Sequence, residues 1–374
     1  MQNFIVVGEM RAIVAQVLLA IHHFTPAHCA VISGKGSNSL RLSRLCARFV
    51  NLDFYGVDDQ RFVDTVNQFS AQHAGTVLVA GDCQAIKMVN RVRTYLKVSI
   101  SAVPDNAMLS VLEDKWSFYQ FCKANGLTVP LTVLVNAKGE LDFKTIAERL
   151  GLPFVVKPLD QLASYGVEII SDEQQFNKAI LDNEAYQYAP LIVQRFVAGT
   201  DIGLNLLSIR GRVKTLACQK PDGTRMRFFA DRTLEQVAHV IANQSGYHGI
   251  MNVDARIEDG TGNIYLIESN PRVWRSHYAS VWCGMNFCAE SLKEEQESDE
   301  VQRLSSGESD VYYHPLFRPS QWSTVLFDKT HRGRLLRIMM FDPYTLVSSI
   351  RPLLQGGWQH LNWMLLRRRV KRVY

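Results

Sequence analysis

The chain has 374 residues, of which 47% are hydrophobic and 21% charged, and its formal net charge is +5. This composition is that of a globular protein with sizeable cores, and the length predicts two or three domains. The longest apolar runs are too short to span a bilayer as a helix. The start, MQNFIVVGEM, reads as a strand and lacks the basic segment of a signal peptide.

The seven cysteines are scattered and none forms a C-x-x-C pair, so neither a zinc site nor a disulfide framework is predicted. Reduced cysteines and the missing signal sequence favour the cytoplasm. The positive charge is concentrated at one end, because residues 311–374 hold eleven Lys or Arg and two Asp. That segment carries +9, which leaves −4 for the remainder of the chain.

Residues 1 to about 100 alternate strand and helix patterns. FIVVG, HCAVIS and TVLVAGD are short apolar runs of the buried-strand type, and RAIVAQVLLAIHHF and RFVDTVNQFSAQH have helical spacing. This alternation predicts a parallel sheet with helices on both faces. Gly8 ends the first strand, but no G-x-G-x-x-G is present, so a dinucleotide site is not expected.

The next elements are predicted from their end signals. DKWSFYQFCKAN is a helix with Asp114 near its start and Gly126 as its stop, and KTIAERLGLP is a second helix. PFVVKPL is a strand that carries Lys157. SDEQQFNKAILDNE is helical, with Ser171 as N-cap and Gln174 three residues on, the pattern of a capping box. Strands then follow around expected turns at Gly199–Thr200 and Arg210–Gly211.

The segment 246–277 holds the strongest candidate site. VDARIE and NIYLIES are of strand type, and EDGTGN between them predicts a hairpin with Asp254 on one strand and Glu268 at the end of the other. Glu268 and Asn270 are two apart and share a face. Carboxylate and amide oxygens suit Mg²⁺, and Arg272 suits a phosphate. The alternative is an ordinary hairpin with solvated acids.

Taken in order, these segments resemble the ATP-grasp superfamily over roughly residues 1–290, closest to the biotin carboxylase, carbamoyl phosphate synthetase and D-alanine ligase type. The resemblance is carried by DKWSFYQFCKANGLTVP, LPFVVKPLDQLASYGV, VQRFVAGTDIGLNLL and VDARIEDGTGNIYLIESNPR. It implies an α/β and α+β fold: a Rossmann-like pre-ATP-grasp domain (1–110), an ATP-grasp domain (111–290, with a lid subdomain at about 125–195 and a large subdomain at about 196–290), an acidic linker (291–310) and a basic C-terminal extension (311–374).

The resemblance also implies roles for residues that would bind ATP. Lys115 and Lys157 would contact its phosphates, although a surface helix lysine is the alternative for Lys115. Ser164 and Gly166 would donate from the lid loop DQLASYGV, which departs from the Gly-rich family pattern by having one glycine. In the hinge, the backbone of Arg195 and Val197 would contact the adenine, and Gln194 occupies a position that is usually acidic in the family. Asp201 would contact the ribose at a position where the family has a glutamate.

Asp254, Glu268 and Asn270 would bind Mg²⁺ or Mn²⁺, with Arg272 and Lys157 as the catalytic residues. Arg275 and His277 follow closely and are candidates to face substrate, the alternative for His277 being a surface or core histidine. The implied activity is an ATP-dependent ligase that activates a carboxylate as an acyl phosphate and couples it to an amine, releasing ADP and phosphate. Carboxylation, carbamoyl-phosphate chemistry and a non-catalytic nucleotide-binding module remain alternatives. Dimers are common in the family, and no nucleic-acid motif is present.

The acidic stretch 290–310 reads as a linker or a solvated helix. Beyond it, the end of the chain, WQHLNWMLLRRRVKRVY, mixes tryptophan and leucine with a basic cluster at 367–372. Three interpretations stay open for this tail: a helix packed on the body, contact with an anionic membrane surface at its inner face, and contact with a partner or an acidic substrate.

Overall fold

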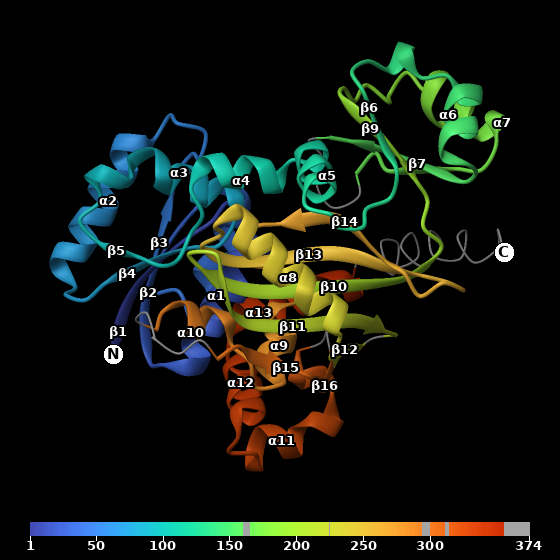
Figure 1. The fold of residues 1–374 in the computed structure, drawn as a ribbon. Helices are drawn as coiled ribbons and strands as arrows, with labels where there is room; N and C mark the ends of the chain where they lie inside the picture. Colours follow the sequence, from blue (N-terminus) through green and yellow to red (C-terminus); the bar gives the residue numbers. More distant parts are fainter. Residues whose placement is uncertain (160–164, 224, 294–299, 311–313, 355–374) are drawn as a thin grey trace.

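The computed structural model describes residues 1–159, 165–223, 225–293, 300–310 and 314–354 (Figure 1). The described residues contain three β-sheets: a five-stranded sheet at the N-terminus, a four-stranded sheet and a seven-stranded sheet. In the part of the chain that is described, no helix is both long and apolar enough to cross a membrane.

The five-stranded sheet is parallel throughout, with the strand order β3-β2-β1-β4-β5, which confirms the prediction from the strand–helix alternation. Side chains alternate along β1, so Phe4 and Val6 pack on the side of α1 while Ile5 and Val7 pack on the side of α2 and α3. The elements are β1 (Gln2–Val7), α1 (Arg11–Phe24), β2 (Ala27–Ser33), η1 (Lys35–Leu42), β3 (Arg48–Asn51), α2 (Asp59–Gln72), β4 (Val77–Ala80), α3 (Cys83–Val92), η2 (Arg93–Tyr95) and β5 (Ser99–Ile100).

Two short helices, α4 (Asn106–Glu113) and α5 (Lys115–Ala124), lead from this sheet to the next (Figure 1). Asp114 caps α5 as predicted, because its carboxylate accepts a hydrogen bond from the backbone N–H of Ser117 at 2.7 Å. Gly126 follows with φ +69°, the left-handed conformation that ends many helices.

The four-stranded sheet is antiparallel, with the order β6-β9-β7-β8, and packs against α6 and the helix that begins with α7. The predicted N-cap at Ser171 is wrong by one residue: the carboxylate of Asp172 accepts from Gln175 N at 2.7 Å, and Gln175 accepts from Ser171 N at 3.1 Å. The elements are β6 (Thr132–Val135), η3 (Lys138–Glu140), α6 (Phe143–Leu150), β7 (Phe154–Pro158), β8 (Glu168–Ile170), α7 (Glu173–Phe176), the π-helical turn Asn177–Leu181 and β9 (Leu191–Arg195).

The seven-stranded sheet has the order β14-β13-β10-β11-β12-β16, with β15 paired to β11, and α8 covers one of its faces. The predicted turn at Gly199–Thr200 is wrong, because both residues begin β10 and Gly199 pairs with Glu258 of β13. A Cβ at Gly199 would overlap the carbonyl of Ile257, so glycine serves close strand pairing here. The elements are β10 (Gly199–Ile209), β11 (Arg212–Asp222), β12 (Arg225–Phe229), α8 (Arg232–Ser245), β13 (Gly249–Glu258) and β14 (Ile264–Asn270).

The predicted turn at Arg210–Gly211 is confirmed, since both residues have positive φ between β10 and β11. After α9 (His277–Trp282) and α10 (Phe287–Ser291), the stretch expected as a linker or helix contains two strands, β15 (Gln302–Leu304) and β16 (Ser306–Asp310). Pairing with β11 and β12 gives this polar stretch its regular structure.

The C-terminal elements lie against α1, α9 and the N-terminal domain. Asp342, at the start of the last helix, is buried and accepts from the Ser43 hydroxyl and the Arg44 N–H, both at 2.8 Å. The segment after η1 and the start of α13 therefore pack together. The elements are η5 (Pro315–Phe317), η6 (Pro319–Gln321), α11 (Trp322–Phe327), α12 (His331–Met340) and α13 (Pro343–Leu354).

Candidate active site

The β13–β14 hairpin brings the three predicted oxygen ligands together. Asp254 pairs with Glu268 across the two strands, and the register shifts directly after this pair because β14 carries one extra residue there. Such bulges re-aim side chains and are frequent beside active sites. Asn270 pairs with Asn252, and its Nδ2 donates to Asp254 Oδ2 at 3.1 Å. Two carboxylates and an amide thus meet at one end of the hairpin.

The electrostatic environment of Asp254 disfavours the charged form of its carboxyl group. Burial and the neighbouring Glu268 raise the pKa of Asp254 to about 7, against the opposing influences of Arg272 and Asn270. A divalent cation would relieve the repulsion directly.

Arg272 joins this group through Asn270. Its Nη2 donates to Asn270 Oδ1 at 2.7 Å and its Nη1 to the carbonyl of Val273 at 3.0 Å. Arginine only donates, so the amide oxygen of Asn270 must face it and the Nδ2 must face the other way. That Nδ2 donates to Asn252 Oδ1 at 3.2 Å, and Asn252 Nδ2 donates to Asn205 Oδ1 at 3.0 Å. A row of amides with one polarity therefore runs from Arg272 across β14, β13 and β10.

Lys157 approaches the same carboxylates from the small sheet. It stands in β7, and its Nζ donates to Gln194 Oε1 at 2.8 Å, while Gln194 Nε2 donates to Thr132 Oγ1 at 2.9 Å. Burial, together with the charges of Lys115 and Arg256, lowers the pKa of Lys157 to about 8, against the opposing charges of Glu268 and Asp254. The lysine of one sheet and the carboxylates of the other share one electrostatic environment.

Lys115 is the first residue of α5, where its Nζ donates to the carbonyl of Leu159 at 3.1 Å. This bond joins α5 to the chain just after β7, so Lys115 lies on the same side as Lys157.

Asp201 is 60% exposed and forms an ion pair with Arg256 Nε at 3.1 Å. A ribose contact from Asp201 would have to compete with this pair.

Arg195 is the last residue of β9, and Val197 lies in the connection from β9 to β10. The backbone N–H of Arg195 donates to the carbonyl of Leu131 at 2.8 Å, so it is not free to read a base edge. The Arg195 guanidinium pairs with Glu258 at 3.0 Å and lies over the Tyr265 ring at 4.8 Å. Val197 is buried.

The lid prediction is only partly within the described residues. Ser164 lies outside them. Gly166 has φ +70°, and a Cβ there would meet Pro158 and Tyr188, so the position requires glycine. Its carbonyl accepts from the hydroxyl of Tyr186 at 2.7 Å, which ties this end of the loop to the segment before β9.

His277 faces the core, so the idea that it faces substrate is wrong. It is fully buried against Trp274 and Phe287, at ring-centroid distances of 5.0 and 6.1 Å. Burial lowers its pKa to about 3, so the ring is neutral at ordinary pH. Within the described residues neither ring nitrogen has a hydrogen-bond partner. Arg275 is exposed.

Three further residues belong to this neighbourhood although no role was predicted for them. Arg256 is two residues after Asp254 on the same face of β13, and its Nη2 donates to the Gly199 carbonyl at 2.6 Å. Asn252 and Asn205 continue the amide row. The signal for these residues is a polar side chain at a buried position inside an otherwise apolar strand, as in IMNVDA and GLNLL.

The N-terminal sheet also reaches this site. The backbone N–H of Val273 donates to the carbonyl of Gly81 at 3.3 Å. Asp82 is buried and accepts from Met10 N at 2.7 Å and Ala85 N at 3.0 Å. Burial raises its pKa, and the charge of Arg272 opposes that rise. The carboxyl ends of β1 and β4, where the strand order reverses, thus lie beside the Arg272 segment, the place where open α/β sheets bind ligands.

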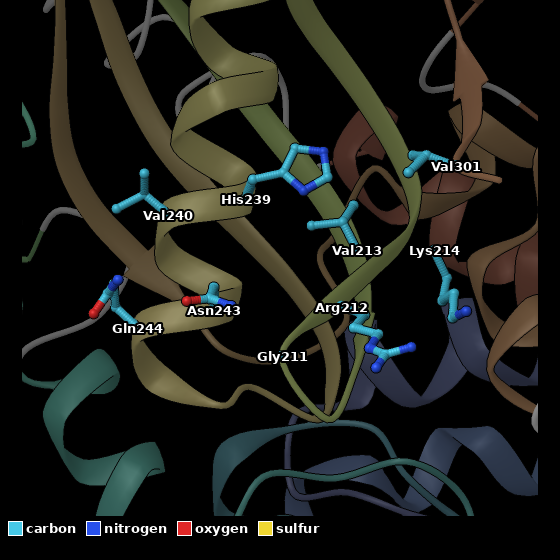
Figure 2. Close-up of a pocket in the computed structure, with 9 residues that line it drawn as sticks. All are labelled: Gly211, Arg212, Val213, Lys214, His239, Val240, Asn243, Gln244 and Val301. Carbon is cyan, nitrogen blue, oxygen red and sulfur yellow. The ribbon is translucent and has the colours of Figure 1, made fainter. Parts of the chain in front are cut away.

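A groove of about 480 Å³ lies elsewhere, between α8 and the turn that joins β10 to β11 (Figure 2). His239 projects into it from α8, with Val213 and Val301 along the other side. None of the predicted site residues lines this groove. We therefore assign the candidate active site from the convergence of charged groups and not from this cavity.

The chain was also compared with known proteins. Residues 112–276 match the model of the ATP-grasp domain. Over this segment, which is somewhat less than half of its length, the chain is therefore similar to the ATP-grasp domain. The arginine-specific carbamoyl phosphate synthase large chain of Bacillus subtilis (strain 168) is 24% identical over 188 residues, which cover 45% of this chain and 17% of that one.

Two further proteins are similar to this chain. The D-alanine–D-alanine ligase of Nitrosomonas europaea is 30% identical over 95 residues, 25% of this chain and 30% of the ligase. The chain thus spans less than a third of either curated relative. The biotin carboxylase domain dimer of 2-oxoglutarate carboxylase from Hydrogenobacter thermophilus, solved with MgADP, ADP and bicarbonate, aligns with a TM-score of 0.60 at 14% identity, over 80% of this chain and 71% of that one. At this identity the likeness shows the mixed α/β ATP-grasp fold alone.

Proposed function

We propose that this chain is an ATP-dependent ligase that activates a carboxylate as an acyl phosphate and couples it to an amine. One observation carries the proposal: Asp254, Glu268 and Asn270 converge with Arg272 and Lys157 between two sheets. The ATP-grasp domain and its relatives among carbamoyl phosphate synthases and D-alanine–D-alanine ligases support it.

The residues present fit Mg²⁺ (or Mn²⁺). Among the described residues no three His, Cys, Asp or Glu side chains cluster, so the protein would supply two carboxylates and one amide. Mg²⁺ commonly keeps water and takes phosphate oxygens beside one or two carboxylates. The repulsion that raises the pKa of Asp254 favours a cation there. Asp254, Glu268 and Asn270 would hold it, and the bound ion would neutralise charge on the phosphates of ATP.

The remaining side chains would position the reactants. Lys157 and Lys115 would contact the phosphates, and Arg272 would hold the transferred phosphoryl group. A carboxylate oxygen of the substrate attacks the γ-phosphorus and ADP leaves; the amine nitrogen then attacks the acyl carbon and phosphate leaves. Arg272 suits both steps, because its guanidinium can bind the phosphoryl group before and after transfer.

For the nucleotide, the carbonyl of Arg195 and the backbone of Val197 would hold the adenine edge beside Gln194, since the N–H of Arg195 is bonded to Leu131. Asp201 would leave Arg256 to contact the ribose. Ser164 and Gly166 would donate to the phosphates from the lid loop.

The finer organisation is proposed with the same function. Residues 1–110 would form a Rossmann-like pre-ATP-grasp domain, 111–290 the ATP-grasp domain, 291–310 an acidic connection and 311–374 a basic extension. The parallel sheet, the β13–β14 hairpin and the excess of Lys and Arg at the end support this division. We propose a cytoplasmic homodimer that takes small-molecule carboxylates and amines and no nucleic acid. The dimeric solved relative supports the assembly.

The test is phosphate release from ATP with Mg²⁺ across pools of amino acids and small carboxylates, with ADP and AMP separated. Substrate-stimulated release of ADP and phosphate is expected, and Glu268→Ala should abolish it. Asp259→Ala is the matched control, because Asp259 is an exposed acid in the turn of the same hairpin. Unchanged turnover in Glu268→Ala would refute the metal assignment. ATP binding without turnover in any pool would favour the non-catalytic alternative, and turnover that requires bicarbonate would favour carboxylation or carbamoyl-phosphate chemistry.

A further inference from the structure

The segment that enters α11 concentrates exposed apolar side chains. Five large apolar residues within 316–327 are exposed: Leu316 (45%), Phe317 (41%), Trp322 (45%), Leu326 (69%) and Phe327 (78%). Elsewhere in the described chain, exposed large apolar residues are scattered over the surface. Single exposed apolar residues are ordinary on a protein surface, whereas a cluster marks a contact site. We call these five residues the α11 patch.

The patch is presented on a fixed element. Val325, on the inner side of α11, is buried, and Arg337 of α12 donates to the carbonyls of Val325 at 3.0 Å and Asp328 at 2.8 Å. Gly333 lets the two helices approach closely, because a Cβ there would overlap the Asp328 carbonyl. The outer face of α11 is therefore exposed while its inner face is packed and hydrogen-bonded.

The surroundings of the patch are basic. Residues 314–354 hold six Lys or Arg and two Asp. Lys329 and Arg332 are exposed in the turn after α11 and the start of α12. Of the two acids, Asp342 is buried in its contact with Ser43, and Asp328 accepts from Thr330 N at 2.7 Å. Two exposed cations thus follow the apolar residues of α11 directly, a combination that is complementary to a surface that is apolar inside and anionic outside.

The shape of the region suits such a surface. α11 lies at the end of the molecule away from the small sheet that carries Lys157 (Figure 1). The indole N–H of Trp322 is already bonded to the carbonyl of Pro315 at 3.1 Å, so the exposed part of the ring offers apolar surface. Neither of the two cavities described on the molecule includes a residue of the patch.

We propose that the α11 patch docks the protein on the headgroup region of an anionic lipid membrane. Leu326, Phe327 and Trp322 would enter the interface between headgroups and acyl chains, and Lys329 and Arg332 would meet the anionic headgroups. The site that holds Asp254 lies on other elements, so a docked molecule keeps its candidate active site accessible.

The test is co-sedimentation of the full chain with vesicles of phosphatidylcholine alone and of phosphatidylcholine mixed with phosphatidylglycerol. Binding to the anionic vesicles only, weakening with added salt, is expected. The double variant Leu326→Glu/Phe327→Glu should lower the partition coefficient roughly tenfold or more. Val57→Glu is the matched control, since Val57 is 84% exposed on the N-terminal domain and should bind like the wild type. Retained ADP binding and an unchanged Tm show that the double variant is folded.

A second variant, truncated after Leu354, separates the patch from the tail. If the double variant binds like the wild type while truncation abolishes binding, the patch is not the docking surface. If the wild type binds neither kind of vesicle, the proposal is refuted. If instead the wild type is a dimer by light scattering and the double variant a monomer, with no vesicle binding by either, the patch is an interface between two copies and the membrane assignment is wrong.

Discussion

Asn270 donates a hydrogen bond from its Nδ2 to Oδ1 of Asn252, its partner across β14 and β13, at 3.2 Å. Arg272 sets the direction of this bond. Its guanidinium can only donate hydrogen bonds, so the amide oxygen of Asn270 must accept from Arg272 and the Nδ2 must point to Asn252. Asn252 and Asn205 hold the Nδ2 side of the amide, so its oxygen stays on the side of Arg272. In the proposed function, Asn252 is thus a positioning residue for a metal ligand.

Replacing Asn252 with leucine should weaken metal-dependent nucleotide binding. The side chain has a similar volume but cannot hold Asn270, so the amide oxygen loses its fixed direction. We expect MgADP to bind roughly fivefold more weakly, about 1 kcal/mol, in line with the loss of one hydrogen bond. Calorimetric titration with ADP should be done with and without Mg²⁺. A purely structural role would lower both affinities alike, and that result would contradict the prediction.

The sequence was sufficient for the hairpin and for the proximity of Asp254, Glu268 and Asn270 because that information is local. The alternation in VDARIE and NIYLIES and the Gly-rich turn between them predict the two strands, and the spacing of two between Glu268 and Asn270 predicts their common face. The cap at Asp114 and the parallel N-terminal sheet followed from similarly local patterns. Neighbouring cap candidates were harder to separate, as Ser171 and Asp172 illustrate, because serine and aspartate are both preferred N-cap residues and only Asp172 serves as the cap here.

Contacts set by long-range register could not be predicted. The pair formed by Asp201 and Arg256 depends on the alignment of β10 with β13, and the bond between Asn205 and Asn252 depends on the same alignment. Gly199 looked like a turn because glycine favours turns, whereas its role is to let Ile257 approach. His277 was ambiguous because a histidine after a basic loop reads equally as a site residue or a core residue.

The contact between Asp342 and Ser43 spans 299 residues and leads to a prediction about the C-terminal helices. Asp342 is buried and accepts from the Ser43 hydroxyl, the Arg44 N–H and the Thr345 N–H. Asp342→Ala would leave these donors without their acceptor, so we expect the free energy of unfolding to fall by about 3 kcal/mol. Urea denaturation measures it. Asp328→Ala, which removes an acid near the surface, should cost less than about 1 kcal/mol; equal losses would mean that Asp342 does not hold the two ends together.

His277 should make stability depend on pH in acid. Burial lowers its pKa in the folded state to about 3, against 6.5 for an ordinary histidine. Between these values the unfolded chain binds a proton that the folded chain excludes, so stability falls as pH drops below about 6.5, by about 1.4 kcal/mol per pH unit for this residue. His277→Phe keeps an aromatic ring against Trp274 and removes the titration.

Urea unfolding at pH 7 and pH 5 measures the effect. Between these two pH values the free energy of unfolding of the wild type should fall by roughly 2 kcal/mol more than that of the variant. His22, His23 and His314, whose pKa values burial also lowers, are present in both proteins and do not affect the difference. Parallel profiles for the two proteins would mean that the histidine is not excluded from protonation in the folded state.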